Sequence, residues 1–227
     1  MSEMKYLFTL ILVLFVAFLT RAQVAIINDK DGFTNVRKEP NAQSSIIHKI
    51  TNNKVFWYDL EQAQDGSDWV KVYIPTDAFS LKTRENDYIE GFIHTSRLQP
   101  LEQIKSYKGS DFSFKYVIEP FKLGGRSVEK QDGKWVKAIG GRNVWGTDGN
   151  FPKIQVKGIQ VNVAGKAIPI GKALYADIYE CTNDFKVYKS ADTYFVYQWN
   201  SDGAGAYQVV WVFTKAGLKQ RFVGSMI

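Results

Sequence analysis

Apolar and polar residues alternate in short stretches along most of the chain, and turn-forming residues separate these stretches. Before residue 100 the pattern predicts five short strands that are rich in β-branched and aromatic residues. The predicted strands span 24–27, 46–50, 55–60, 69–74 and 89–94. No stretch in this part repeats at helical spacing. We expect a small barrel here, because closure of a sheet removes its exposed edges.

A second series of strands follows residue 110. Phe112–Glu119 and Ile154–Val163 alternate between apolar and polar positions, and Asp132-Gly133 is a favoured hairpin turn. Three hairpins are predicted, which join 127–130 to 135–139, 185–188 to 194–199 and 207–213 to 218–223. A single helical turn is expected within Lys172–Glu180. The pattern predicts a β-sandwich or a β-sheet domain of about eight strands.

The stretch between the two series divides the chain. Residues 101–109 lack the alternation of apolar and polar residues that is typical of a strand, and they are expected to form a linker. They separate a first unit, residues 23–100, from a second unit, residues 110–227. We expect the segment 23–104 to fold on its own. The chain is therefore predicted to be all-β, with residues 1–22 placed before both units.

The N-terminus has the features of an export signal. Lys5 precedes a run of 13 residues, Leu7–Leu19, in which Thr9 is the only polar residue. As a helix this run spans about 20 Å, which is shorter than the roughly 30 Å hydrocarbon core of a membrane. Small residues at Thr20 and Ala22 predict a secretory signal peptide cleaved between Ala22 and Gln23. Retention as a membrane anchor is the alternative, and the mature chain is expected to be periplasmic or secreted, without a further membrane span.

Composition and charge narrow the picture further. Aromatic residues make up 15% of the chain and charged residues 23%, which excludes an intrinsically disordered chain. Residues 23–104 carry a net charge of −3, whereas residues 105–227 hold 18 Lys and Arg against 10 Asp and Glu, a net charge of +8. No run of five or six basic residues occurs. We therefore interpret the positive charge as dispersed lysines that keep the second unit soluble, rather than as a dedicated anion site. It still predicts weak, salt-dependent association with anionic polymers.

Several motifs follow one another in the first unit. Residues 31–40 (DGFTNVRKEP) hold a strand ending in Asn-Val-Arg and a loop with Pro40, and the strand at Ile46-Ile47 follows. Residues 69–72 (WVKV) form a Trp-centred strand, and residues 90–98 (EGFIHTSRL) end the series. Together these motifs resemble the bacterial SH3-like (SH3b) domain, over roughly residues 24–100.

The insertion at residues 75–88 departs from the SH3b pattern, which usually has a short turn there. We expect it to extend a loop over the binding face.

The resemblance implies a small SH3-like barrel that binds cell-wall material, because members of this family accompany cell-wall enzymes and can bind peptidoglycan. Flat aromatic side chains beside a polar loop suit sugar rings or peptide stems. Trp57 and Tyr58 are adjacent, so they should point to opposite sides of a strand, one into the core and one outward. Tyr73 and Tyr88 add aromatic surface near the insertion. Trp69 is expected to anchor the core.

Two loops of the second unit concentrate oxygen-bearing side chains and glycines. The first loop spans residues 146–150 and includes Asp148, and the second spans residues 200–205. Their composition fits either a calcium-binding loop or ordinary turns, and we favour turns. The second loop lies between the two most aromatic strands, so a site in this unit is expected there. Its candidate ligand-binding residues are Trp145, Trp199, Asp202 and Tyr207.

The residue types limit catalytic chemistry. His48 and His94 both precede residue 95, and Cys181 is the only cysteine. A Ser–His–Asp, Cys–His or multi-histidine zinc site built from the second unit alone is therefore excluded. Cys181 is interpreted as a buried, inert thiol. A carboxylate-pair glycosidase remains formally open, although no spacing singles out a pair among Asp111, Glu119, Asp148, Asp177, Glu180 and Asp202.

These observations predict an exported, non-catalytic binding protein of the cell envelope, without a cofactor or a metal. The expected partner is peptidoglycan or a cell-wall peptide bound by the SH3-like unit, and nucleic acid is not expected. Two alternatives stay open. One is an inhibitor or immunity-like protein that binds an envelope enzyme through its basic second unit, and the other is a carboxylate-based hydrolase.

Overall fold

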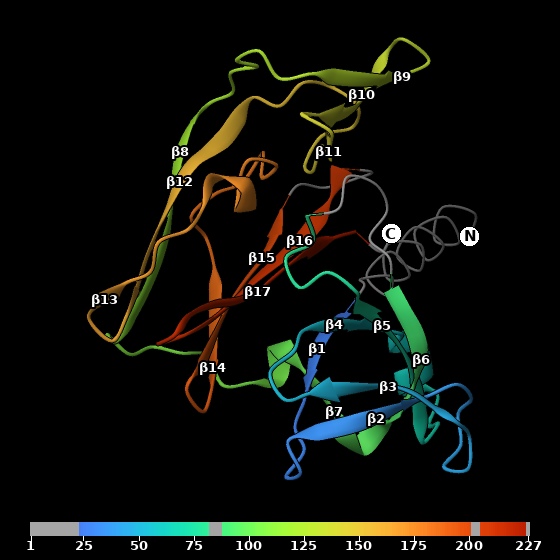
Figure 1. The fold of residues 1–227 in the computed structure, drawn as a ribbon. Coiled ribbons are helices and arrows are strands. Elements are labelled where there is room, and N and C mark those ends of the chain that lie inside the picture. The colour runs from blue at the N-terminus through green and yellow to red at the C-terminus, as the bar shows by residue number, and fades with distance from the viewer. Residues whose placement is uncertain (1–22, 82–87, 201–204, 226–227) are drawn as a thin grey trace, which may run out of the picture.

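The computed structural model describes residues 23–81, 88–200 and 205–225. The expectation of an all-β chain is confirmed, because the described residues form several antiparallel sheets (Figure 1). Within these residues, none of the helices has the length and apolar character needed to cross a membrane. The expected signal peptide and its cleavage site at Ala22 lie outside the described residues.

The described residues of the first unit form one sheet of seven strands in the order β3-β2-β6-β5-β4-β1-β7. Its strands are β1 (Gln23–Ile27), β2 (Phe33–Arg37), β3 (Ile46–Thr51), β4 (Phe56–Tyr58), β5 (Trp69–Pro75), β6 (Tyr88–His94) and β7 (Leu98–Pro100). The outermost strands, β3 and β7, do not pair with each other among the described residues, so the expected closed barrel is corrected to an open sheet. Pro100 lies in β7, an edge strand of this sheet, which is the kind of strand where proline is tolerated.

Among the described residues, the first unit also contains two short helices, α2 (Leu60–Gln64) and η1 (Thr95–Arg97). A third, η2 (Leu101–Gln103), follows in the segment 101–109. The helix α2 replaces the end of the predicted strand 55–60, because the side chain of Asp59 accepts a hydrogen bond from the backbone N–H of Gln62 and so caps a helix start.

The second unit contains three sheets in the described residues. Their orders are β13-β12-β8, β11-β10-β9 and β14-β15-β16-β17. The strands are β8 (Phe112–Pro120), β9 (Val128–Gln131), β10 (Trp135–Ile139), β11 (Arg142–Asn143), β12 (Ile154–Val163), β13 (Lys166–Ala167), β14 (Lys186–Ser190), β15 (Thr193–Asn200), β16 (Tyr207–Thr214) and β17 (Gly217–Gly224). The three predicted hairpins are confirmed as β9–β10, β14–β15 and β16–β17. The predicted helical turn is the short 3-10 helix η3 (Lys172–Leu174).

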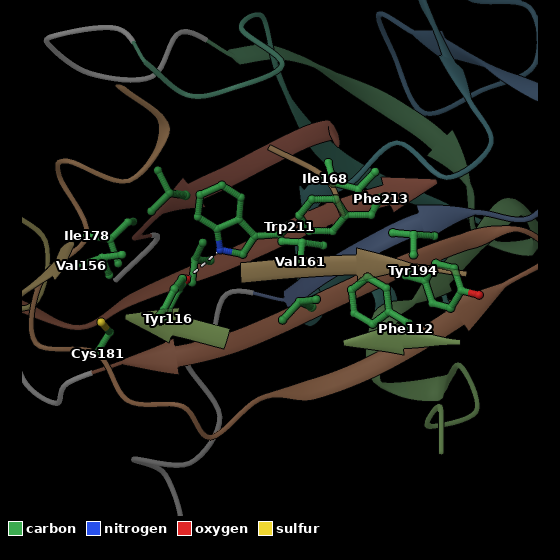
Figure 2. Packing of buried hydrophobic residues seen from close by; sticks show 14 of the residues in the cluster. Phe112, Tyr116, Val156, Val161, Ile168, Ile178, Cys181, Tyr194, Trp211 and Phe213 are labelled. Carbon is green, nitrogen blue, oxygen red and sulfur yellow. Dashed lines mark hydrogen bonds between the residues drawn. The ribbon is translucent and has the colours of Figure 1, made fainter. Parts of the chain in front are cut away.

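The sheet β14–β17 is buried on both faces, and this makes it the central layer of the molecule. One face packs against β8 and β12 to form what we call the outer core, part of which is drawn in Figure 2. The other face packs against the first unit, and we call this cluster the shared core. Its buried members are Val24, Ile26, Val55, Trp57, Leu101, Ile104, Tyr188, Phe195, Tyr197, Val210, Val212 and Phe222.

The segment 101–109, expected to be a linker, is packed against the second unit. Leu101 is fully buried, Ile104 is nearly so, and both belong to the shared core. The backbone N–H of Tyr107 donates to the carbonyl oxygen of Val187 at 2.8 Å, which ties the segment to the edge strand β14. The two units thus share one layer of apolar packing, and independent folding of residues 23–104 stays a prediction.

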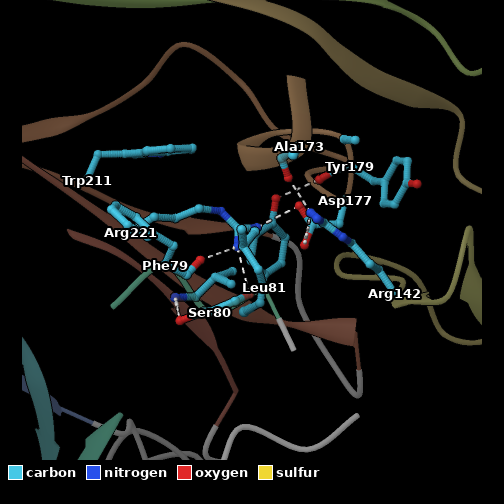
Figure 3. Close-up of polar contacts among 12 residues, drawn as sticks. Phe79, Ser80, Leu81, Arg142, Ala173, Asp177, Tyr179, Trp211 and Arg221 are labelled. Carbon is cyan, nitrogen blue, oxygen red and sulfur yellow. Dashed lines mark hydrogen bonds and ion pairs between the residues drawn. The ribbon is translucent and has the colours of Figure 1, made fainter. Parts of the chain in front are cut away.

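The described part of the insertion, residues 75–81, also packs against the second unit. Arg221 of β17 donates from its backbone N–H to the carbonyl oxygen of Ala78 at 3.0 Å. Its guanidinium donates to the carbonyl oxygens of Phe79 and Ser80, both at 2.9 Å, as Figure 3 shows. Residues 75–81 are therefore held against β17, and the expectation that the insertion extends over the binding face stays a prediction. Residues 82–87 lie outside the described residues.

Candidate functional site: an aromatic rim beside the shared core

Three of the predicted ligand-binding residues are core residues in the structure. Trp57 is fully buried in the shared core, and Tyr58 is buried in the separate core of the first unit. Their side chains do point to opposite faces of β4, but both faces are covered, so the expectation that one is exposed is wrong. Tyr207 is buried in the outer core, where its hydroxyl donates to the carbonyl oxygen of Tyr179 at 2.7 Å.

Burial also sets the protonation of these phenols. Desolvation, with a smaller contribution from Glu102, raises the pKa of Tyr58 to about 12. Desolvation likewise raises the pKa of Tyr207 well above its ordinary value. Both hydroxyls therefore stay neutral further into the alkaline range than an exposed tyrosine does, as expected for packing residues.

Tyr73, Tyr88 and Trp199 have a different environment, and we call these three residues the aromatic rim. All three are half-buried and pack against the shared core. Tyr73 and Tyr88 come from the neighbouring strands β5 and β6, whereas Trp199 comes from β15 of the second unit. The structure thus brings predicted residues of both units to one apolar cluster.

The buried Trp57 contacts two residues of the aromatic rim. Its indole Nε1 donates to the hydroxyl of Tyr88 at 3.3 Å. Trp57 also lies opposite Tyr73 in the pairing of β4 with β5. The Nζ atom of Lys71 lies 4.9 Å from the ring centroid of Tyr73 and 2.8 Å from Oε2 of Glu90. The rim therefore combines aromatic surface with one cation and one carboxylate, the groups that recognise sugars and peptides.

The first oxygen-rich loop of the second unit meets Gly205, at the end of the second loop. The backbone N–H of Gly146 donates to the carbonyl oxygen of Gly205 at 3.0 Å, and Gly146 has a φ of +93° that favours glycine. A Cβ atom on Gly205 would lie 2.8 Å from the backbone of Thr147, so the close approach also requires glycine there. Trp145 packs nearby, with its ring centroid 6.2 Å from that of Tyr207.

The calcium alternative finds no support among the residues described on these loops. No group of three or more His, Cys, Asp or Glu side chains that could hold a metal ion occurs within residues 23–81, 88–200 and 205–225. Asp202, the predicted ligand of the second loop, lies outside them.

Several carboxylates of the second unit accept hydrogen bonds from neighbouring groups. Oε1 of Glu180 accepts from the backbone N–H groups of Lys153 and Ile154. Hydrogen bonds from Tyr107 and Tyr194, and a weaker one from Lys189, lower the pKa of Asp111 to about 2. A glycosidase acid needs the opposite shift, towards a raised pKa.

The histidines occupy two separate places in the first unit. Nδ1 of His94 accepts from the backbone N–H of Ser96 and so caps η1, while its ring makes an edge contact with Trp69 at 5.5 Å. Desolvation, followed by the charge of Lys54, lowers the pKa of His48. The contact between His94 and Ser96 is therefore explained by the capping of a short helix.

Cys181 is expected to resist thiol reagents in the folded chain. It is buried, and desolvation raises its pKa to about 12. Because a higher pKa leaves less thiolate, the reactive form at pH 8 is about a thousandfold rarer than for an ordinary thiol. Labelling with a disulfide reagent should therefore require urea. Labelling of the folded protein at the rate of free cysteine would contradict the inert assignment.

Comparison of the chain with protein-family models gives no match. Comparison with curated proteins gives none, and comparison with solved structures gives none. The resemblance to the SH3b domain therefore rests on the residue motifs alone and stays a prediction.

Proposed function

We propose that this chain is an exported, non-catalytic binding protein of the cell envelope that binds peptidoglycan or a cell-wall peptide. The observation that carries the proposal is the aromatic rim, where Tyr73, Tyr88 and Trp199 pack against one cluster and keep part of their surface open. Half-buried aromatic rings held on strands lose little freedom on binding and can stack on sugar rings or peptide stems.

Two further features support this proposal. The SH3-like motifs at residues 31–40, 69–72 and 90–98 imply a cell-wall binding module. The N-terminal pattern implies export to the compartment where such material is found.

The rim is tested by co-sedimentation of the mature chain with purified peptidoglycan. We expect Tyr73→Ala and Trp199→Ala each to raise the apparent dissociation constant about tenfold, because removing one aromatic contact costs roughly 1–2 kcal/mol. Trp135→Ala is the matched control, since Trp135 is 44% exposed and lies on β10, outside the rim. Its binding should equal that of the parent.

Salt separates rim binding from general attraction by the positive charge. Raising salt to about 0.5 M shortens the Debye length to roughly 4 Å and should leave the short-range stacking contacts in place. Binding that disappears completely at this salt, with both rim variants equal to the parent, would overturn the proposal. Stoichiometric capture of one envelope enzyme in place of peptidoglycan would favour the inhibitor alternative instead.

A further inference from the structure

A second site of different chemistry is formed in the second unit, at the Pro120 end of β8. A pocket of about 410 Å³ opens between this end of β8, the following loop and the segment that contains η3. Four basic side chains and one acidic side chain line it, with Tyr175 among the remaining residues. The charged lining residues are Lys122, Arg126, Lys157, Lys172 and Glu119.

Arg126 is fixed in the wall of this pocket. Its guanidinium donates to Oε1 of Gln155 at 2.8 Å and to the hydroxyl of Tyr179 at 3.0 Å, and its Nε donates to the carbonyl oxygen of Leu123 at 3.0 Å. All of these acceptors are neutral, and within the described residues Arg126 makes no ion pair with a carboxylate. Its positive charge is therefore held in place without a counter-charge in contact.

Among the described residues that line the pocket, Glu119 is the only carboxylate, and two lysines share it. Nζ of Lys122 lies 3.8 Å and Nζ of Lys157 lies 3.9 Å from the same Oε2 atom. These distances are at the long end for an ion pair, and the two lysine side chains are 71% and 66% exposed. Exposed pairs of this kind contribute little to stability, so the ammonium groups can turn towards an incoming anion.

Gln155 connects the acid to the arginine. Its Nε2 donates to Oε1 of Glu119 at 2.8 Å while its Oε1 accepts from Arg126. This hydrogen bond is the main cause that lowers the pKa of Glu119, with smaller contributions from the nearby lysines, including Lys172. The carboxylate therefore stays ionised, and the pocket keeps three positive charges in excess.

The geometry points to a binding site for an anionic glycan, that is, sugar or polyol units that carry phosphate or carboxylate groups. The volume falls in the range of small-molecule sites and suits one or two sugar units. The lysines supply donors for the anionic group, while Arg126 supplies a fixed positive charge, because its own N–H groups already donate to acceptors of the protein. Glu119 supplies an acceptor for hydroxyls, and Tyr175 adds an aromatic side chain to the lining. This inference does not depend on the rim, because the two sites share no residue.

The test is a calorimetric titration of the mature chain at low salt with three probes, namely glucose 6-phosphate, glucuronate and glucose. We expect the phosphate or the carboxylate sugar, or both, to bind at least tenfold more tightly than glucose, and the better of the two identifies the anionic group. The double variant Lys122→Gln with Lys157→Gln should weaken that binding about tenfold or more, because it removes two charged donors.

The matched control is the double variant Lys166→Gln with Lys215→Gln. It removes the same net charge from exposed positions outside the pocket, and its binding should stay within about twofold of the parent. Equal losses in the two double variants would show attraction by net charge alone and would overturn the site. Equal binding of glucose and the anionic sugars would overturn it as well. Peptidoglycan binding through the rim should survive in both variants, so failure of this inference and failure of the proposed function can be told apart.

Discussion

Asp177→Ala is expected to lower the free energy of unfolding by about 3–5 kcal/mol, because it leaves a buried arginine without its counter-charge. Oδ1 of Asp177 lies 2.6 Å from Nη2 of Arg221, and both side chains are almost completely buried. As Figure 3 shows, the same guanidinium also holds the carbonyl oxygens of Phe79 and Ser80. The loss therefore weakens the contact between residues 75–81 and β17. Urea unfolding of the mature chain measures the change.

Arg142→Gln is the matched control for this ion pair. Nη1 of Arg142 lies 3.7 Å from the other oxygen of Asp177, and its side chain is 20% exposed. A longer and partly solvated pair is expected to contribute about 1 kcal/mol or less. Similar losses for Asp177→Ala and Arg142→Gln, or a loss below about 1 kcal/mol for Asp177→Ala, would contradict the central role of the buried pair.

Local features of the fold could be predicted from the sequence. The hairpin β9–β10 follows from Asp132-Gly133, since both residues adopt the positive φ values that such a turn needs. The strands β15 and β16 follow from their β-branched and aromatic residues. Pairing between strands that follow one another depends on short segments of sequence. Residue composition and the alternation of apolar and polar residues are therefore sufficient to predict it.

The burial of Trp57 and Tyr58 could not be predicted, because it depends on a partner far away in sequence. Alternation correctly places their side chains on opposite faces of β4. The face that carries Trp57 is covered by β14–β17, from which Phe222 approaches to 4.7 Å between ring centroids. The sequence of the first unit alone contains no sign of this second layer.

The basic pocket and the buried ion pair could not be predicted from the sequence for a similar reason. The pocket gathers Lys122 and Arg126 from one segment, Lys157 from β12 and Lys172 from η3, so no run of basic residues marks it. The two members of the buried ion pair, Asp177 and Arg221, are 44 positions apart. A count of neighbouring charges detects only clusters that are continuous in sequence.

Trp57→Ala is expected to destabilise the mature chain by about 3–5 kcal/mol, because a fully buried tryptophan leaves a large cavity. Trp57 is 0% exposed, packs on Phe222 of β17 and donates to the hydroxyl of Tyr88. Its environment is built from both units. We therefore expect the substitution to shift a single cooperative unfolding transition that includes the first and the second unit.

Trp69→Ala provides the comparison within the same sheet. The sequence marks Trp69 as a core anchor, but the structure corrects this, since its half-buried ring contacts His94 at the surface. Its loss should cost only about 1–2 kcal/mol, in proportion to the apolar area that it covers. If Trp57→Ala costs no more than Trp69→Ala, or if two transitions occur and only one moves, the shared core does not couple the units. The expected result is a single unfolding transition that shifts markedly more for Trp57→Ala than for Trp69→Ala. It would mean that the packing of β1 and β4 against β14–β17 holds both units in one cooperative fold. Only contacts common to both units can shift the unfolding of both units together.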